Sequence, residues 1–367
     1  MARPHPLLID LVAGRILRVP VEPGIVRSAF EHRVGGLLKT AVDLGASATQ
    51  EAMRMLDQAD ISAWARNRVV AEAMVEMAGV ATDLGIDIAF IKGVSIETRW
   101  YGRLGERPTW DVDAVLAPWH RHRAPELVAA LQPTHSMLPH LESILKKDRL
   151  QSIDLGYRSL PVDLHLDPLK FELADSRYPE RIWEDLQTLD LEHGSVRVFD
   201  PAASLFLAAL SVNKDRFRHL IGHSDLIRIQ ADPSTDIARC ESLAKGEGML
   251  VPLGASLAAV WSDLGMTGGQ TTVTSRAWDV LWGKSIRLLG EEAKVRFRYR
   301  QSLIPLFDLR RWPEVIASWR RRLLPSRALL DHWYPQLRGP YLARIVSGRI
   351  SRRLQRRRQR QALRPGA

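Results

Sequence analysis

Two short runs, each carrying aspartate among strand-forming residues, constrain this chain most. Residues 111–116 read DVDAVL, and residues 161–166 read PVDLHL. Runs of this length that are rich in valine and leucine are typical of strands, where carboxylates are otherwise disfavoured. Because the side chains of a strand alternate between its two faces, Asp111 and Asp113 are expected on one face. Asp163 is expected on a later strand that pairs alongside.

Three carboxylates on one face repel one another unless a divalent cation neutralises them. The only cysteine, Cys240, excludes a disulfide framework and a cysteine-based zinc site. Oxygen ligands without cysteine favour Mg²⁺ or Mn²⁺. The sequence therefore predicts a metal site at Asp111, Asp113 and Asp163. We interpret the histidines at 120, 122, 135 and 140 as structural or surface residues, because they form no regular ligand pair.

A glycine follows a short predicted strand upstream of these aspartates. Residues 86–91 read IDIAFI and come after Leu84-Gly85, a typical helix end. Lys92-Gly93 then leads into a predicted helix over 96–101. Gly93 allows a phosphate to approach the backbone, while Lys92 and the helix-start N–H groups would hold its charge. A phosphate cradle facing a carboxylate-held metal is the minimum set for phosphoryl or nucleotidyl transfer.

The order of elements predicts an α+β protein. Helical periodicity covers 24–45 and 62–83, a further helix is expected over 120–132, and strands 152–157 and 160–166 are expected to form a hairpin around Arg158-Ser159. Beyond Pro201 the pattern is mostly helical, at 205–212, 225–230 and 253–261, with a loop near 268–275. We expect an N-terminal helical region (1–85), a core with a small sheet (86–200), a C-terminal helical domain (201–310) and a basic helical tail (311–367).

Charge is distributed unevenly along the chain. The net charge is +10, but residues 294–367 hold 20 Lys and Arg against 3 Asp and Glu, leaving 32 against 39 in the rest. The body is therefore mildly acidic. In the tail, Leu342, Ile345, Val346, Ile350 and Leu354 follow one face of a helix. The arginines of 344–364 are expected either to be solvated or to bind an anionic partner such as nucleic acid, a membrane surface or an acidic peptide.

No apolar run reaches the length of a membrane-spanning helix, and the first residues are not expected to form a signal peptide. We therefore expect no transmembrane segment and a cytoplasmic protein.

A family resemblance rests on the central motif. The run IKGVSIETRWYGRLGERPTWDVDAVLAP, followed by PVDLHLDP, resembles an uncharacterised bacterial nucleotidyltransferase family of the DNA polymerase β superfamily. The matching residues are Lys92, Gly93, Tyr101, Arg107, Pro108, Asp111, Asp113, Asp163 and His165. Residues 213–229 are similar to a helical segment of that family that ends in an aspartate–leucine pair, here Asp225-Leu226. The superfamily's usual Gly-Gly or Gly-Ser is replaced here by Lys-Gly, with 17 residues between Gly93 and Asp111.

The resemblance implies a small mixed sheet with two metal ions on Asp111, Asp113 and Asp163. A nucleoside triphosphate would lie against Lys92, Gly93 and Ser95. Arg107 would bind phosphate or brace the aspartates, and His165 would support the site from behind or pack in the core. Lys214 and Asp225 would either reach the cleft from the helical half or form ion pairs within their helix. Apart from the resemblance, Glu97 lies one turn into the helix after Gly93, where it is expected to be a solvated residue, the alternative being a metal or substrate contact.

The acceptor that the resemblance implies is a peptide, sugar or small molecule, as in bacterial natural-product or surface-polymer pathways. Two alternatives remain open at this level. One keeps the metal site but transfers a sugar or sugar phosphate from a nucleotide sugar. The other is a non-catalytic protein that binds nucleic acid or an anionic surface through its arginine-rich tail.

Overall fold

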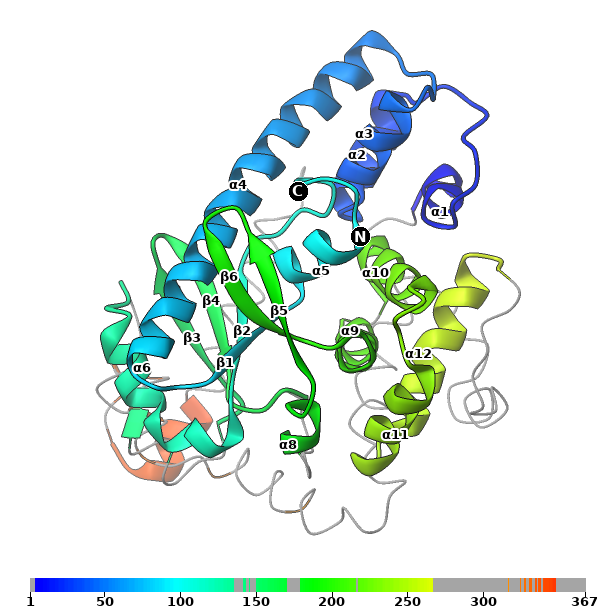
Figure 1. Cartoon of the computed structure of the whole chain (residues 1–367). Coiled ribbons are helices and arrows are strands. Elements are labelled where there is room, and N and C mark those ends of the chain that lie inside the picture. Colours follow the sequence, from blue (N-terminus) through cyan, green and yellow to red (C-terminus); the bar gives the residue numbers. More distant parts are fainter. Residues whose placement is uncertain are drawn as a thin grey trace.

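A six-stranded mixed sheet forms the centre of the protein and carries helices on both faces (Figure 1). Figure 1 is a computed structural model, and it describes residues 4–134, 150–169, 179–215 and 217–266, with scattered residues between 141 and 145 and between 316 and 347. The strand order is β3-β4-β2-β1-β6-β5. The α+β prediction is confirmed.

The strands are β1 (Ile88–Ile91), β2 (Val112–Leu116), β3 (Ser152–Tyr157), β4 (Leu160–His165), β5 (Leu186–Leu191) and β6 (Gly194–Phe199). Strand β2 is antiparallel to β1 and parallel to β4. The predicted β3–β4 hairpin is confirmed, and its turn residues Arg158 and Ser159 both have positive φ, as a tight hairpin turn requires. The β5–β6 hairpin was not predicted, although Val196 and Val198 alternate as strand residues do.

Alternation along the strands divides the sheet into two chemically different faces. One face carries Ile88, Phe90, Val112, Ala114, Val162 and Leu164, and it packs on helices α4 (Gln50–Asp83) and α6 (Ala124–Ala130). The opposite face carries Asp113, Asp163 and His165. This second face looks toward the C-terminal helices α9 (Pro201–Lys214) and α10 (Leu220–Ala231), which share a core with the N-terminal helices.

The N-terminal helices depart from the prediction of one helix over 24–45. They are α1 (Pro6–Val12), α2 (Pro23–Glu31) and α3 (Gly35–Asp43). The chain breaks at Arg33, whose φ of 61° does not belong to a right-handed helix. Gly36 then packs on the loop before β2, because a Cβ there would lie 2.3 Å from the carbonyl oxygen of Glu106. The second predicted helix begins earlier than expected, at Gln50, where the Thr49 hydroxyl accepts the N–H of Ala52.

Prolines account for another difference. The helix expected over 120–132 is a 3₁₀ turn (Pro118–Arg123) followed by α6, because each segment starts with its own proline near the first position. The remaining helices are α5 (Gly93–Trp100), α8 (Pro179–Ile182), α11 (Ile237–Gly246) and α12 (Leu250–Asp263). The predicted helices at 205–212, 225–230 and 253–261 lie within α9, α10 and α12.

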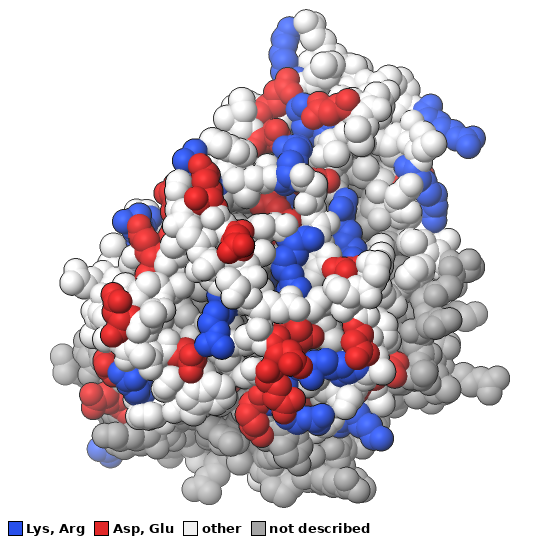
Figure 2. Space-filling view, in the orientation of Figure 1, with Lys and Arg blue, Asp and Glu red and all other residues white. Residues whose placement is uncertain are grey.

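The basic tail falls largely outside the described residues, as does the loop predicted at 268–275. Of its apolar stripe, Ile345 is buried with Leu330 and Tyr334, whereas Leu342 and Val346 are exposed. On the face shown in Figure 2, basic and acidic side chains are interspersed over the described residues. Among the described residues, no helix combines the length and apolar character needed to cross a membrane.

Candidate functional site

A pair of carboxylates lies side by side at the centre of the sheet. The parallel register of β2 and β4 places Asp113 next to Asp163. His165 lies on the same face, with its Nε2 atom 2.8 Å from Oδ1 of Asp113 and 3.5 Å from Oδ2 of Asp163. Residues 163 and 165 therefore share a face of β4, as the alternation of side chains along a strand requires. Ligand atoms of all three residues lie within 4.8 Å of one another.

Asp113 is held in its ionised form. Burial by itself would raise its pKa, but the Lys92 ammonium, 3.0 Å from Oδ1, and His165 together hold the pKa of Asp113 well below its usual range. Burial lowers the pKa of His165, so its ring is neutral near pH 7. A neutral ring has one N–H, and an ionised carboxylate only accepts, so Nε2–H donates to Asp113. His165 thus orients the Asp113 carboxylate and helps to keep it ionised.

Asp111 differs from the prediction in its local structure. Strand β2 begins at Val112, so Asp111 precedes the strand, and its side chain is exposed. Partial burial and the nearby carboxylates of Asp113 and Asp163 raise the pKa of Asp111, while Lys92 and Arg33 oppose that rise. Asp111 is therefore close to the carboxylate pair electrostatically. Its part in metal binding stays a prediction.

Lys92 and Gly93 form a strained turn between β1 and α5. Lys92 has a φ of 58° and Gly93 a φ of 43°, a region that side chains disfavour. A Cβ on Gly93 would lie 2.8 Å from Cγ2 of Thr109, so only glycine fits. The Ser95 hydroxyl donates to the carbonyl of Lys92 over 2.6 Å and stabilises this turn. Ser95 therefore lies behind the turn, whereas the Lys92 side chain extends to Asp113.

A cavity of about 320 Å³ opens beside the carboxylates, between the sheet and helices α9 and α10. Eight of the ten predicted site residues line it: Lys92, Gly93, Arg107, Asp111, Asp113, Asp163, Lys214 and Asp225. Ser95 and His165 are not among the lining residues. The helical half contributes a wall of mixed charge that includes Asp215, Arg218 and His219. The structure thus brings the separate sequence motifs to one place.

Arg107 spans the two halves of this cavity. Its Nε and Nη2 atoms donate to the two oxygens of Asp225 on α10, over 2.8 and 2.7 Å. Tyr101 donates to the same carboxylate over 2.7 Å, and its phenol is buried. The predicted alternatives for Arg107 were phosphate binding or support of the aspartates on the strands. Its observed partner is instead the helical Asp225, and Asp225 pairs with another element rather than within its helix.

Glu97 contradicts the expectation of a solvated helix residue, since only 1% of it is exposed. Its Oε1 atom accepts the backbone N–H groups of Gly105 and Arg107 over 2.7 and 2.9 Å, and Oε2 accepts the Asn67 amide over 2.6 Å. Asn67 also accepts the N–H of Thr109 over 3.0 Å. Burial raises the pKa of Glu97 to about 7, although these donors oppose the rise. Glu97 and Asn67 therefore set the path of the loop before β2.

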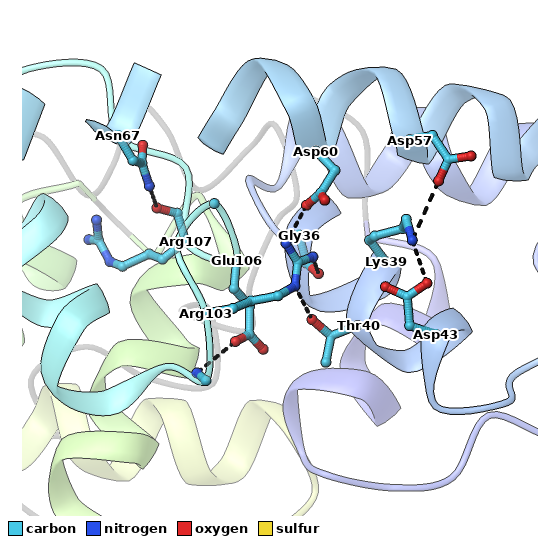
Figure 3. A network of polar contacts seen from close by, with 12 residues as sticks. Gly36, Lys39, Thr40, Asp43, Asp57, Asp60, Asn67, Arg103, Glu106 and Arg107 are labelled. Atoms are coloured by element: carbon cyan, nitrogen blue, oxygen red, sulfur yellow. Dashed lines mark hydrogen bonds and ion pairs between the residues drawn. The ribbon is translucent and has the colours of Figure 1, made fainter. Parts of the chain in front are cut away.

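The same loop is tied to the N-terminal helices (Figure 3). Arg103 donates to Asp60 of α4 over 2.6 Å and to Thr40 and the Gly36 carbonyl of α3 over 3.3 and 3.4 Å. Figure 3 also shows Asn67 donating to the carbonyl of Arg107, over 2.8 Å. The loop that carries Arg107 and leads to Asp111 is therefore held from both sides.

The carboxylate pair fits a divalent cation. Two adjacent carboxylates, one of them held ionised, present hard oxygen ligands at the cavity wall. His165 contributes orientation, because the atom that faces the pair is already hydrogen bonded to Asp113.

Comparison with known proteins identifies the family of this chain. Residues 23–259 match the sequence model of a family described as uncharacterised nucleotidyltransferases. The chain belongs to this nucleotidyltransferase family. Among curated proteins, none matches the chain significantly. A solved antigenic nucleotidyltransferase-like protein from Paracoccidioides brasiliensis is 18% identical over 53% of this chain and 92% of its own, with a TM-score of 0.30.

Several cavity residues of this nucleotidyltransferase-family chain escaped the sequence analysis. Arg33 lies in the N-terminal helical region, far along the chain from the aspartates, yet it lines the cavity. Trp110 also lines the cavity, and 41% of it is exposed. Its position next to Asp111 was the only signal that the sequence held for it.

Proposed function

We propose that this protein transfers a nucleotidyl group from a nucleoside triphosphate to a hydroxyl or phosphate oxygen of an acceptor, in a reaction that depends on Mg²⁺ or Mn²⁺. The observation that carries the proposal is the meeting of Lys92, Asp113 and Asp163 at one cavity, in a chain that belongs to a nucleotidyltransferase family. The Lys92 ammonium and the two carboxylates at one wall of the cavity suit a substrate that is itself a polyanion with a bound metal ion.

The donor triphosphate would lie against the turn of Lys92 and Gly93. Gly93 is the first residue of α5, where N–H groups without helical partners attract phosphate. Lys92 neutralises Asp113 when no substrate is bound. With a triphosphate present, the same ammonium is within reach of the phosphate charge.

The transfer would be a single in-line displacement. An acceptor oxygen forms a bond to the α-phosphorus, the bond from that phosphorus to the bridging oxygen breaks, and pyrophosphate leaves. Asp163, which is less buried than Asp113, is the base that takes the acceptor's proton. A divalent cation on Asp111, Asp113 and Asp163 would neutralise phosphate charge and lower the pKa of the acceptor. His165 and Lys92 keep Asp113 ionised and oriented for this role.

The acceptor is proposed to be a peptide, sugar or small molecule in a cytoplasmic pathway, including natural-product tailoring. This part of the proposal is supported by the family resemblance alone.

The test is binding of each nucleoside triphosphate, with and without Mg²⁺, followed by thermal unfolding. A ligand at about 100 times its Kd should stabilise the native state by about 2.7 kcal/mol. We expect stabilisation that needs Mg²⁺ and is lost in Asp113→Asn. Asp190→Asn is the matched control, because Asp190 is an exposed aspartate on β5 of the same sheet. Equal stabilisation of the wild type and Asp113→Asn, or none by any triphosphate, would overturn the proposal.

A further inference from the structure

We infer that Arg33 and Arg218 form a second phosphate-binding subsite beside Trp110, and that this subsite holds a phosphate group of the acceptor. The inference deepens the proposed function and rests on it. The inference narrows the class of acceptor to phosphate esters. The reaction that produces the acceptor must therefore be a phosphorylation, or a cleavage that leaves a terminal phosphate on the acceptor.

Two arginines from different elements line the same cavity. Arg33 comes from the turn between α2 and α3, and Arg218 from the turn between α9 and α10. Both residues are exposed, and neither forms an ion pair with a carboxylate within the described part of the chain. Two guanidinium groups that line one cavity provide the N–H donors that phosphate accepts.

The two turns are joined to each other. His219 donates from Nδ1 to the carbonyl of Glu31 over 3.1 Å, and the N–H of Ile221 donates to the carbonyl of His32 over 3.3 Å. Burial lowers the pKa of His219, and the charge of Arg33 lowers it further, which places Arg33 close to this junction. The arginines therefore belong to one preformed wall.

Backbone strain is concentrated at this wall. Arg33 has a φ of 61°, and Phe217, the buried residue before Arg218, has a φ of 54°. Lys92, at the donor end of the cavity, has a φ of 58°. Among the described residues, the other non-glycine positions with positive φ are Gln132, Arg158 and Ser159, which lie outside the cavity. Left-handed backbone is disfavoured at residues other than glycine, and it is concentrated at binding and catalytic sites.

Trp110 contacts Arg33 through the face of its ring. The guanidinium carbon of Arg33 lies 4.9 Å from the centre of the Trp110 ring, and that of Arg66 lies 5.5 Å from it. Stacking on an indole restricts a guanidinium group while leaving its N–H edge free to donate. Arg66 does not line the cavity, so it provides an internal comparison.

The position of Arg33 favours the acceptor over the donor. Lys92 contacts Asp113 on β2, whereas Arg33 lies over the ring of Trp110, the residue before Asp111. The two cations thus stand at different parts of the carboxylate row. An in-line displacement needs the attacking oxygen and the leaving pyrophosphate on opposite sides of the α-phosphorus. If pyrophosphate leaves on the Lys92 side, an anion at Arg33 and Arg218 belongs to the acceptor.

The experiment measures binding of inorganic phosphate to the full chain saturated with a non-hydrolysable triphosphate analogue and Mg²⁺. We expect phosphate to bind this complex, and Arg33→Ala and Arg218→Ala each to weaken phosphate binding at least about tenfold without changing the Kd of the analogue. Arg66→Ala should leave both constants unchanged. Arg33→Gly serves as a second variant, because glycine relieves the strained backbone and separates loss of the side chain from misfolding.

Three outcomes would overturn the inference. Phosphate that binds only without the analogue, and competes with it, would assign the arginines to the donor. Absence of phosphate binding to the saturated complex would remove the subsite. Failure of the analogue itself to bind would overturn the proposed function, and the acceptor subsite with it. Because the analogue is titrated before phosphate, this outcome is distinguished from a failure of the phosphate subsite alone.

Discussion

Arg107 and Asp225 form a two-point ion pair between the loop that enters β2 and helix α10, with N–O distances of 2.8 and 2.7 Å. Both side chains are largely buried, at 11% and 6% exposed. Through this pair the carboxylate wall and the helical wall of the cavity become one unit. The shape of the cavity is therefore expected to depend on a contact that lies beside the reacting groups.

Removing one partner of this pair should be strongly destabilising. Asp225→Ala leaves the Arg107 charge buried without its partner, which costs about 3–5 kcal/mol in the free energy of unfolding, measured by urea denaturation. Replacing both residues, as in Arg107→Met with Asp225→Leu, should recover much of that loss. Arg197→Met breaks an exposed pair with Asp87 and should leave stability almost unchanged. A loss below about 1 kcal/mol for Asp225→Ala would contradict this account.

Glu97 should make stability depend on pH near neutrality. Burial raises its pKa in the folded protein to about 7, above the unfolded value near 4.5, so the folded state binds the proton more tightly. Glu97 therefore favours folding below about pH 4.5, and this contribution is lost as pH rises through 7. As pH falls from 8 to 4.5, the unfolding free energy of the wild type should rise by up to about 3 kcal/mol relative to that of Glu97→Gln.

A second substitution tests the hydrogen bonds of Glu97. In Glu97→Gln the new amide faces the amide of Asn67, so two donors oppose each other. Adding Asn67→Asp supplies an acceptor and should recover part of the stability at pH 7.5. Parallel pH curves for wild type and Glu97→Gln, or no recovery in the double variant, would show that the carboxylate does not organise this loop.

Gly93→Ala should weaken triphosphate binding and lower stability by about 2 kcal/mol, measured by calorimetry and denaturation. The reasons are a positive φ of 43° and a Cβ that would lie 2.8 Å from Cγ2 of Thr109. Adding Thr109→Ser removes that methyl group. It should restore only the part of the stability that is lost through the steric clash. Gly79→Ala is the matched control, since that helical glycine has open space and should become slightly more stable. Wild-type stability in Gly93→Ala would refute the strained turn.

Gly36→Ala should displace α3 from the loop before β2. A Cβ at this position would lie 2.3 Å from the Glu106 carbonyl oxygen, and backbone atoms move less readily than side chains. We expect a loss of at least about 2 kcal/mol in unfolding free energy, together with weaker phosphate binding at Arg33. Gly24→Ala, in α2 with nothing within 4 Å, should be neutral or stabilising. Equal behaviour of the two variants would mean that α3 does not pack as described.

The sequence determined those parts of the site that depend on local periodicity. A strand alternates, so the placement of Asp163 and His165 on one face followed from their spacing alone, and the hairpin turn at Arg158 and Ser159 followed from the two strands around it. Alternation does not say where a strand begins. Asp111 therefore precedes β2 although its spacing from Asp113 predicted a place within it.

Only the tertiary structure decided which distant residues meet. The sequence predicts that Glu97 is solvated, because carboxylates are usually exposed. In the structure Glu97 is buried, because the backbone of Gly105 and Arg107 folds back onto it. Arg33 reaches the cavity because its own backbone is left-handed. This conformation separates α2 from α3 and directs the Arg33 side chain toward α10. Local sequence sets the period of each element, whereas contacts across many residues are set by packing, which no short motif encodes.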